Sequence, residues 1–329
     1  MSIFSFEINI MKKFLYKLFA YITILCIITI ILNFLYVRLD NFDFYVVDKF
    51  YKMPNNIQIC NFGSSHGMYG FNYENFDKKY VCFNFALSSQ TLSYDYRLLK
   101  YYEDNISEGC LIIIPISYFS FFGKGEIYDS NFETKNSRYY KILPSNFIKQ
   151  YKWKTNFYMN NFPLLVEYSR LPKLLLGLND TPMNEWNKTA ETVNVKDDAY
   201  KAYRRHLIIN KFDDNGKRIF DQDEIHALYE IIKLCKNKKF IPVLVTTPFL
   251  YEYNQCVQNY SPEFLSIFQS IITKVTNNTE IKYYDYSHDK RFLHDYSLFM
   301  NSDHLNKKGA IKFTNIVFNE VLGLGVAPE

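Results

Sequence analysis

Two short segments near opposite ends of the chain contain residue types that can do nucleophilic chemistry. In residues 57–70 an apolar, β-prone run ends at Gly63 and is followed by Ser64, Ser65 and His66. Residues 301–309 contain His304. A serine hydroxyl is a weak nucleophile until a neighbouring base takes its proton, and histidine exchanges protons near neutral pH. We therefore predict that the fold brings Ser65 and His304 together as nucleophile and general base.

The position of Ser65 in the pattern supports this prediction. A strand that ends in glycine and small polar residues places them at the carboxyl edge of a parallel sheet, where open α/β folds bind ligands. A strand-to-helix turn also brings backbone N–H groups close to the nucleophile, where they can stabilise an oxyanion. Taken alone, 63–65 is simply a polar turn and a loop histidine is simply solvated. The other histidines, at 206, 226, 288 and 294, have no comparable sequence context.

These two segments carry a family resemblance. GSSH at 63–66 resembles the first block of the SGNH (GDSL-like) hydrolases, and DHLNKKGA at 303–310 resembles their last block. The membrane-anchored acyltransferase branch, which includes the D-alanyl-lipoteichoic acid transfer protein and alginate O-acetylation proteins, is the most similar. The resemblance covers about residues 56–324. It implies a three-layer α/β/α sandwich with a mostly parallel sheet, with Ser65 and His304 in the catalytic positions.

The sequence departs from the family pattern at the third triad position. The family has Asp three residues before the histidine, where this chain has Asn301. Asp303 is adjacent to His304, and neighbouring side chains of an extended segment point to opposite faces. Three arrangements therefore remain open: a Ser–His–Asn triad, a Ser–His dyad, or a local shift that recruits Asp303.

The oxyanion positions also depart from the pattern. Residues 84–90 (NFALSSQ) lack the glycine of the second block, and Ser117 and Tyr118 stand where the third block has Asn. The backbone N–H of Ser88 or Ser89, or the Gln90 side chain, can substitute for the missing donor. Ser64 replaces the usual Asp before the nucleophile. His66 either contacts substrate or fills the turn.

The N-terminal region predicts a membrane anchor. Residues 18–37 are uncharged, follow Lys12, Lys13 and Lys17, and are long enough to cross a bilayer. Because no small-residue cleavage site follows, we interpret them as a retained signal anchor rather than a cleaved signal peptide. The positive-inside rule places residues 1–17 in the cytoplasm and all residues after 38 outside. The alternative is a buried core helix.

Alternating strand and helix patterns follow a connector at 38–55. Apolar runs predict strands at 58–62, 80–85, 110–116, 240–246 and 281–286. Periodic patterns predict helices at 89–103, after a cap at Asp221, at 262–276 and at 306–322. Residues 121–214 are rich in Tyr, Asn and Lys and contain four prolines, so we interpret them as a helical insertion over the sheet edge. The remainder of 56–324 reads as one α/β domain.

Composition excludes several functional classes. The chain has 329 residues, 48% of them hydrophobic, and a net charge of +4, with no basic block typical of nucleic-acid binding. It has no HExxH, CxxC or glycine-rich phosphate loop, so we predict no metal, nucleotide or other cofactor. The six cysteines are interpreted as free thiols.

The resemblance and the anchor together give the functional expectation. They imply an extracytoplasmic, single-pass protein of the cell (inner) membrane that transfers an acyl group, most simply acetyl, to a cell-surface or secreted glycan. The resemblance also implies a multi-spanning membrane acyltransferase as the acyl donor. Two rivals remain: an esterase that removes acyl groups from glycans, and a non-catalytic assembly or glycan-binding protein that keeps the fold.

Overall fold

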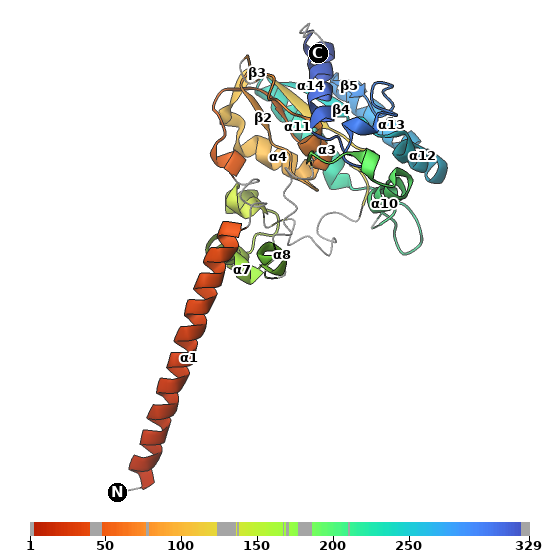
Figure 1. Ribbon diagram of the computed structural model, residues 1–329. Helices are drawn as coiled ribbons and strands as arrows, with labels where there is room; N and C mark the ends of the chain where they lie inside the picture. Colours follow the sequence, from red (N-terminus) through yellow and green to blue (C-terminus); the bar gives the residue numbers. More distant parts are fainter. Residues whose placement is uncertain are drawn as a thin grey trace. The chain divides into compact units, whose positions relative to one another are not determined.

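The computed structural model describes residues 3–39, 48–76, 79–123, 136, 138–166, 168, 171–176, 186–209 and 211–323. The chain divides into two compact units. One comprises Met1–Val47 and Ser137–Asp180, and the other comprises Asp48–Asn136 and Thr181–Glu329. Both units are drawn in Figure 1. Most of the expected connector, at 40–47, lies outside the described residues.

The larger unit is built on a five-stranded parallel sheet. Its strands are β1 (Ile57–Asn61), β2 (Cys82–Asn84), β3 (Ile106–Pro115), β4 (Ile241–Thr246) and β5 (Lys282–Asp285), and they lie in the order β2-β1-β3-β4-β5. Every neighbouring pair is parallel. All five predicted strands are present. Buried, nearly continuous apolar runs such as the second half of β3 are typical of a sheet covered on both faces.

Helices cover the two faces of this sheet (Figure 1). On one face α14 (Lys307–Leu322) packs Phe313, Val317 and Phe318 into a core shared with Leu111 and Val243. The helix α11 (Gln222–Asn237) packs against β4 and against α4 (Leu92–Tyr101). The predicted α/β/α sandwich is therefore confirmed.

Side-chain caps fix the ends of these helices. Asp221 accepts from the Glu224 N–H at the start of α11, and Asn306 accepts from the Gly309 N–H at the start of α14. Pro262 begins α13 (Pro262–Thr279), where its missing N–H costs nothing. The helix α12 (Tyr251–Tyr260) was not predicted, because its aromatic and polar sequence shows little apolar periodicity.

Shorter elements complete the larger unit. The helix α3 (Ser65–Gly70) follows β1, and α10 (Val195–Leu207) packs against α12. Three 3₁₀ turns lie at η1 (Glu103–Asn105), η6 (Ala190–Thr192) and η7 (Tyr296–Leu298). All six cysteines of the chain are free.

The smaller unit is helical. It contains α1 (Ile3–Leu39), η3 (Arg138–Lys141), η4 (Ser145–Phe147), α6 (Trp153–Asn161), α7 (Pro163–Val166) and α8 (Leu171–Leu175). Within α1, the segment Met11–Arg38 has a mean hydropathy of 2.5 and its most apolar stretch is not buried, although Tyr36 near its end is. The segment is therefore long and apolar enough to span a membrane. Residues 121–214, interpreted above as one insertion, contribute to both units. Ser137–Asp180 group with α1 in the smaller unit, and α10 belongs to the larger unit, which we call the α/β unit.

Candidate active site

The turn after β1 positions Ser65. Gly63 has a φ of +102°, a conformation that side-chain-bearing residues rarely adopt, and its N–H donates to Asp95 Oδ1 at 2.9 Å. Ser64 is extended and forms the N-cap of α3, without a side-chain cap bond. Ser65 is thus the first helical residue, half-buried at the carboxyl edge of the sheet. This is the expected strand-to-helix turn.

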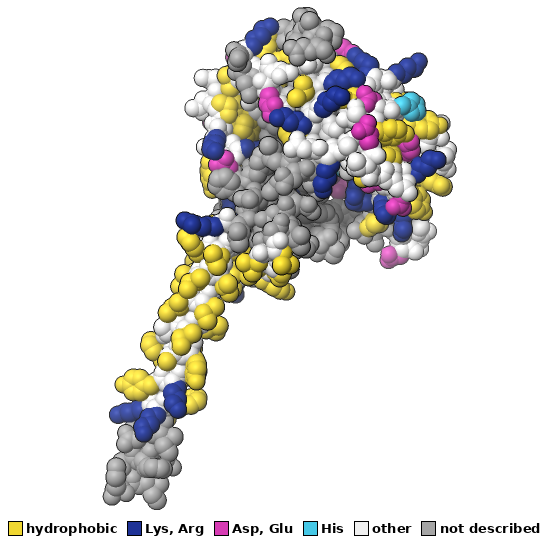
Figure 2. Space-filling view, in the orientation of Figure 1, with side chains coloured by type: hydrophobic (Ala, Val, Ile, Leu, Met, Phe, Trp, Pro, Cys, Tyr) yellow, Lys and Arg dark blue, Asp and Glu magenta, His cyan; other side chains and the backbone are white. Residues whose placement is uncertain are grey.

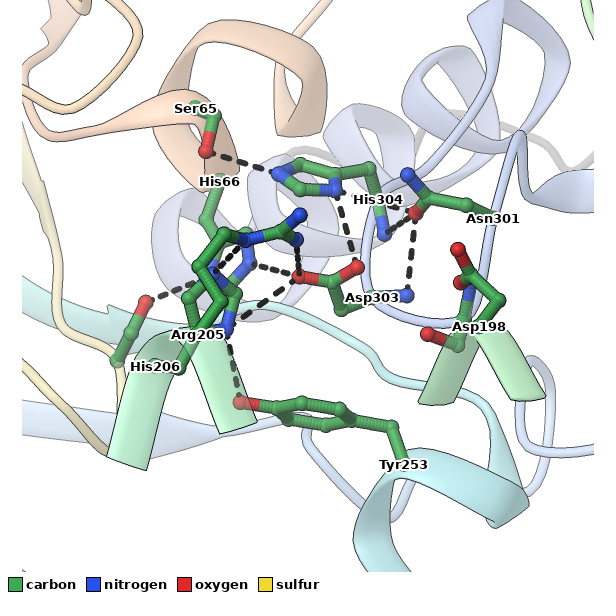
Figure 3. Close-up of polar contacts among 11 residues, drawn as sticks. Ser65, His66, Asp198, Arg205, His206, Tyr253, Asn301, Asp303 and His304 are labelled. Carbon is green, nitrogen blue, oxygen red and sulfur yellow. Dashed lines mark hydrogen bonds and ion pairs between the residues drawn. The ribbon is translucent and has the colours of Figure 1, made fainter. Parts of the chain in front are cut away.

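The loop between η7 and α14 positions His304. An antiparallel bridge between Phe299 and Leu305 closes this loop, and the Met300 N–H donates to the His304 carbonyl at 3.0 Å. His304 Nε2 lies 2.8 Å from Ser65 Oγ, within hydrogen-bond distance (Figure 3). Two residues separated by 239 positions in the sequence therefore meet with the geometry of a nucleophile and its base.

Asn301 holds the other side of the imidazole. Its Oδ1 atom lies 3.1 Å from His304 Nδ1, and it also accepts from the backbone N–H groups of Asp303 and His304, at 3.2 and 2.9 Å. These bonds make residues 301–304 an Asx-type turn. Because an amide oxygen accepts, the Nδ1 atom carries the proton and Nε2 can accept one from Ser65.

Asp303 approaches the same nitrogen. Its side chain is fully buried, and its Oδ1 atom lies 3.2 Å from His304 Nδ1, where it forms an ion pair once the imidazole is protonated. The Nδ1–H bond is aligned with Asn301 instead, and Asp303 Oδ1 makes no hydrogen bond with the described residues. The expected extended segment, in which Asp303 would point away, is replaced by the turn, and strand alternation does not apply there. Asn301 and Asp303 thus both face His304, one as hydrogen-bond acceptor and one as charge.

The second carboxylate oxygen of Asp303 gathers three further groups (Figure 3). Asp303 Oδ2 lies 3.3 Å from His66 Nε2, 3.6 Å from His206 Nδ1 and 3.8 Å from the Arg205 guanidinium. His66 is 2% exposed, and its other nitrogen, Nδ1, lies 2.6 Å from Ser117 Oγ. Since both of its nitrogens are engaged inside the protein, His66 forms the inner wall of the site and is not placed to contact substrate.

The hydrogen-bond partners assign the protons in this cluster. A carboxylate only accepts, so His66 carries its proton on Nε2 and its Nδ1 accepts from the Ser117 hydroxyl. The Arg205 Nε–H donates to His206 Nε2 at 3.4 Å, which leaves the proton of His206 on Nδ1, facing Tyr253 Oη and Asp303. His66 and His206 therefore each direct an N–H toward the buried carboxylate of Asp303.

Burial and charge set the ionisation of the cluster. Burial lowers the pKa of His66 to about 4, although its bond to Asp303 opposes the shift, and burial lowers the pKa of His206 well below its usual range. Burial alone would raise the pKa of Asp303, but the nearby His304 ring and the hydrogen bond from His66 Nε2 hold it well below its usual range. At neutral pH the cluster is therefore one buried anion beside two neutral imidazoles.

Sequence reasoning did not identify Arg205, His206 or Asp198 as site residues. All three lie on α10, within the expected insertion, and Asp198 accepts from the Ser302 N–H at 2.8 Å and so fixes the histidine loop (Figure 3). The local signal is an Asn cap at the start of the helix and three basic residues, Arg204, Arg205 and His206, in its last turn. Nothing in the sequence says which loop that helix packs against.

The N–H groups expected to stabilise an oxyanion differ in whether they are free to do so. Gln90 is buried, and its Nε2 donates to Asp95 Oδ1 at 2.6 Å and to the Phe85 carbonyl at 3.3 Å. Both of its N–H bonds are thereby used, so Gln90 braces the Gly63 turn and does not fit the oxyanion role considered for it. Ser89 is exposed, with a φ of +55°. The N–H of Ser65 itself opens α3, where first-turn N–H groups have no acceptor inside the helix.

The 84–90 loop is nonetheless fastened to the nucleophile turn. The Leu87 N–H donates to the Gly63 carbonyl at 3.2 Å. Asn84 donates to the carbonyls of Gly67, Met68 and Phe71, and accepts from Asn61 at 3.1 Å. This segment is therefore held against the turn and the helix that carry Ser65.

An aromatic wall stands beside the imidazole. The rings of Tyr69 and His304 meet edge to face, 5.7 Å apart, and the Trp186 ring lies 6.3 Å from Tyr69. The indole Nε1 of Trp186 is buried and has no hydrogen-bond partner among the described residues. A buried donor without an acceptor is costly, and an oxygen atom of a bound ligand would satisfy it.

Three of the clustered side chains have the donor atoms of a metal site. His66, Asp303 and His304 each offer a ligand atom, and these atoms lie within 4.8 Å of one another. The same atoms make the contacts that align Ser65, His304 and Asp303. A cation bound there would replace those contacts, so we assign the cluster to proton transfer.

Comparison with known proteins gives distant structural likenesses only. No protein-family model and no curated protein matches the sequence. A GDSL-like lipase from Bacteroides thetaiotaomicron is 10% identical with a TM-score of 0.38, covering 88% of this chain and 100% of its own. A variant of an acetyl-xylooligosaccharide esterase from Geobacillus is 10% identical with a TM-score of 0.39, covering 84% and 97%. At these scores the likenesses carry no assignment. The strand order and helix placement themselves show a three-layer α/β/α sandwich with a parallel sheet, with Ser65 after its first strand and His304 before its last helix.

Proposed function

We propose that this protein is a membrane-anchored serine acyltransferase that moves an acyl group, most simply acetyl, onto a cell-surface or secreted glycan. One observation carries the proposal: Ser65 Oγ lies 2.8 Å from His304 Nε2, while the opposite nitrogen of that ring is bonded to Asn301 and faces the buried carboxylate of Asp303. This arrangement supplies a nucleophile, a base and a group that orients the base.

The first half-reaction loads the enzyme. His304 Nε2 takes the Ser65 proton as Oγ bonds to the carbonyl carbon of the donor, and the carbonyl electron pair moves to oxygen. The N–H of Ser65 is a donor for that oxyanion. When the carbonyl re-forms, the bond to the leaving group breaks, and the leaving oxygen takes the proton from His304. The product is an acyl ester on Ser65.

The second half-reaction releases the acyl group. A hydroxyl of the acceptor attacks the ester carbonyl while His304 takes its proton, and Ser65 Oγ leaves and is reprotonated by His304. A sugar as acceptor gives acyl transfer, and water as acceptor gives hydrolysis. The half-buried Trp186 beside Tyr69, whose indole N–H has no partner among the described residues, supports a sugar acceptor, because a sugar hydroxyl can accept that N–H.

The anchor supports an extracytoplasmic location. Lys12, Lys13 and Lys17 precede the uncharged residues 18–37 of α1, and the positive-inside rule then places the α/β unit outside the cytoplasm. Activated acyl donors made in the cytoplasm must cross the membrane to reach it. We therefore propose a multi-spanning membrane acyltransferase as the partner that delivers the acyl group to Ser65.

The proposal is tested by trapping the acyl-enzyme. The full-length protein in detergent is incubated with p-nitrophenyl acetate and weighed by intact-mass spectrometry. We expect one acetyl adduct on the wild type and on Ser266→Ala, which removes an exposed serine of α13, and none on Ser65→Ala. The absence of both adduct and ester turnover from the wild type would contradict the proposal and favour a non-catalytic role.

A second measurement separates transfer from hydrolysis. The acetylated enzyme is mixed with oligosaccharides of candidate surface glycans, and the decay of the adduct is followed together with the products. Acetylated oligosaccharide formed faster than free acetate indicates a transferase. Release of acetate alone, at a rate independent of the oligosaccharide, would indicate the esterase alternative.

A further inference from the structure

A second apolar surface lies in the helical unit, on the short helices that follow η4. We call it the α6–α8 surface, and its large side chains are exposed by half or more: Trp153 66%, Phe157 50%, Leu165 50%, Tyr168 72%, Leu175 58% and Leu176 71%. Soluble proteins rarely leave such residues clustered and uncovered. Figure 2 shows hydrophobic side chains gathered beside the end of α1, where α7 and α8 lie.

This surface is fastened to the outer end of the apolar helix. Asn33 of α1 donates to the Asn161 carbonyl at 3.1 Å and accepts from the Leu164 N–H at 3.3 Å. Tyr36 and Leu164 pack together as a small core, joined by Leu32 and Leu171. A polar residue inside a membrane span needs such partners, because lipid offers none. The backbone at the junction of α6 and α7 therefore provides both hydrogen-bond partners of the Asn33 side chain, at the depth of Asn33 in the membrane.

The contact with Asn33 fixes the depth of the surface. Asn33 lies four residues before Val37, the last residue of the uncharged segment 18–37, so it is about 6 Å below the outer end of that segment at about 1.5 Å per residue. A segment bonded there lies at the boundary between acyl chains and headgroups. Tryptophan and tyrosine are enriched at that boundary, and interfacial helices insert about 5–10 Å into it.

We propose that the α6–α8 surface inserts into the outer leaflet of the membrane that α1 spans, as a second membrane contact of the same unit. Its exposed aliphatic side chains face the acyl chains. Trp153 lies at the headgroup level, where the Lys154 ammonium, 5.7 Å from the centre of its ring, faces lipid phosphates. The inference rests on the anchored topology of the proposed function and is independent of the chemistry at Ser65.

The chain offers an internal probe for this contact, because its only two tryptophans are Trp153 and Trp186, one in each unit. The full-length protein is placed in nanodiscs of phosphatidylcholine, with and without bromine on the acyl chains near the headgroup. Trp186→Phe leaves Trp153 as the reporter, and Trp153→Phe leaves Trp186. We expect bromolipid to quench Trp153 several-fold more than Trp186, and aqueous acrylamide to quench Trp153 weakly.

A third variant guards against a purely local effect. Leu176→Trp in a chain lacking both native tryptophans reports the end of α8, and it should be quenched by bromolipid as Trp153 is. Quenching of Trp153 by acrylamide but not by bromolipid would overturn the inference and place the surface in water. Protection from both quenchers would also overturn it, since a second copy or another protein would then cover the surface.

Failure of this inference is distinguishable from failure of the anchor. Extraction of the same membranes with alkaline carbonate reports the anchor alone. Retention in the membrane with an unquenched Trp153 would leave α1 as the sole membrane contact. Release of the protein from the membrane would contradict both the α1 anchor and the insertion of the α6–α8 surface.

Discussion

The imidazole of His304 has two neighbours on its Nδ1 side, and substitutions can tell their roles apart. Asp303→Asn keeps the size of the side chain but removes the buried negative charge that stabilises an imidazolium during proton transfer. We expect kcat for p-nitrophenyl acetate to fall by about 10²- to 10⁴-fold, with a much smaller change in KM. Steady-state kinetics checks this, with circular dichroism to confirm that the variant folds.

The complementary substitution, Asn301→Ala, removes a neutral acceptor. It leaves Asp303 within 3.2 Å of Nδ1, and the imidazole can turn toward it. We expect a loss of about 3- to 10-fold in kcat, in line with about 0.5–1.5 kcal/mol for one hydrogen bond. If Asn301→Ala proves more damaging than Asp303→Asn, the working arrangement is a Ser–His–Asn triad and Asp303 is structural.

The buried histidine cluster predicts sensitivity to acid. The pKa of His66 is about 4 in the folded protein, below its value near 6.5 in the unfolded chain, so the unfolded state binds more protons between these values. Stability is then complete above about pH 6.5 and is lost as the pH falls toward 4, by about 3 kcal/mol for this group. The lowered pKa of Asp303 adds a further loss at still lower pH, where its carboxylate is protonated.

Urea unfolding of the α/β unit, measured on the full chain in detergent at about pH 5 and about pH 7.5, checks this expectation. The His66→Gln variant cannot take up the proton and should show a shallower dependence on pH, by about one proton. A variant as pH-sensitive as the wild type would assign the acid sensitivity to other groups.

At the scale of elements, the sheet and most of its helices could be read from the sequence. Buried runs such as residues 110–116 and caps such as Asp221 and Asn306 specify local structure with little help from the rest of the chain. The helix α10 was not foreseen, because two of its four buried residues, Ala199 and Ala202, are small and give a weak apolar period. The inward turn of Asp303 depends on the Asn301 side chain, so strand alternation predicted the opposite direction.

The helix α3 depends on close backbone approach at one glycine. A Cβ atom at Gly67 would lie 2.2 Å from the Phe62 carbonyl oxygen, which no rotamer change can relieve. At Gly70 the nearest atom is the Thr247 methyl group, at 3.1 Å. We expect Gly67→Ala to destabilise the protein by about 2 kcal/mol or more and to displace Ser65, and Gly70→Ala to cost less.

Thermal unfolding and acetyl labelling of both variants measure these effects. Both glycines belong to the same six-residue helix, so the gain in helix propensity from Gly to Ala is similar at the two positions. Equal destabilisation by both substitutions would show that α3 can shift on the sheet. It would contradict the inference that Gly67 is held against the Phe62 carbonyl.

At the scale of the whole molecule, the site is assembled from segments spread along the chain. Ser65 follows the first strand, Arg205 and His206 come from α10, and His304 precedes the last helix. The carboxyl edge of the parallel sheet is where these segments converge, so the nucleophile and base form only when the α/β unit is complete. The residues of the site could be predicted at the two ends of the chain, where each has a local motif, and not in α10, where only tertiary packing selects them.

The anchored topology gives the last prediction, since the proposed acceptor lies outside the cytoplasm. In a Cys256→Ser background, Tyr260→Cys places a thiol at an exposed position of the α/β unit, and Met11→Cys places one before the uncharged residues 18–37. A membrane-impermeant maleimide added to intact cells should label Tyr260→Cys and spare Met11→Cys, because three lysines hold the N-terminus inside. After lysis both should be labelled. Labelling of Met11→Cys alone in intact cells would place Ser65 in the cytoplasm, away from surface glycans, and the transfer reaction would then need a cytoplasmic acceptor.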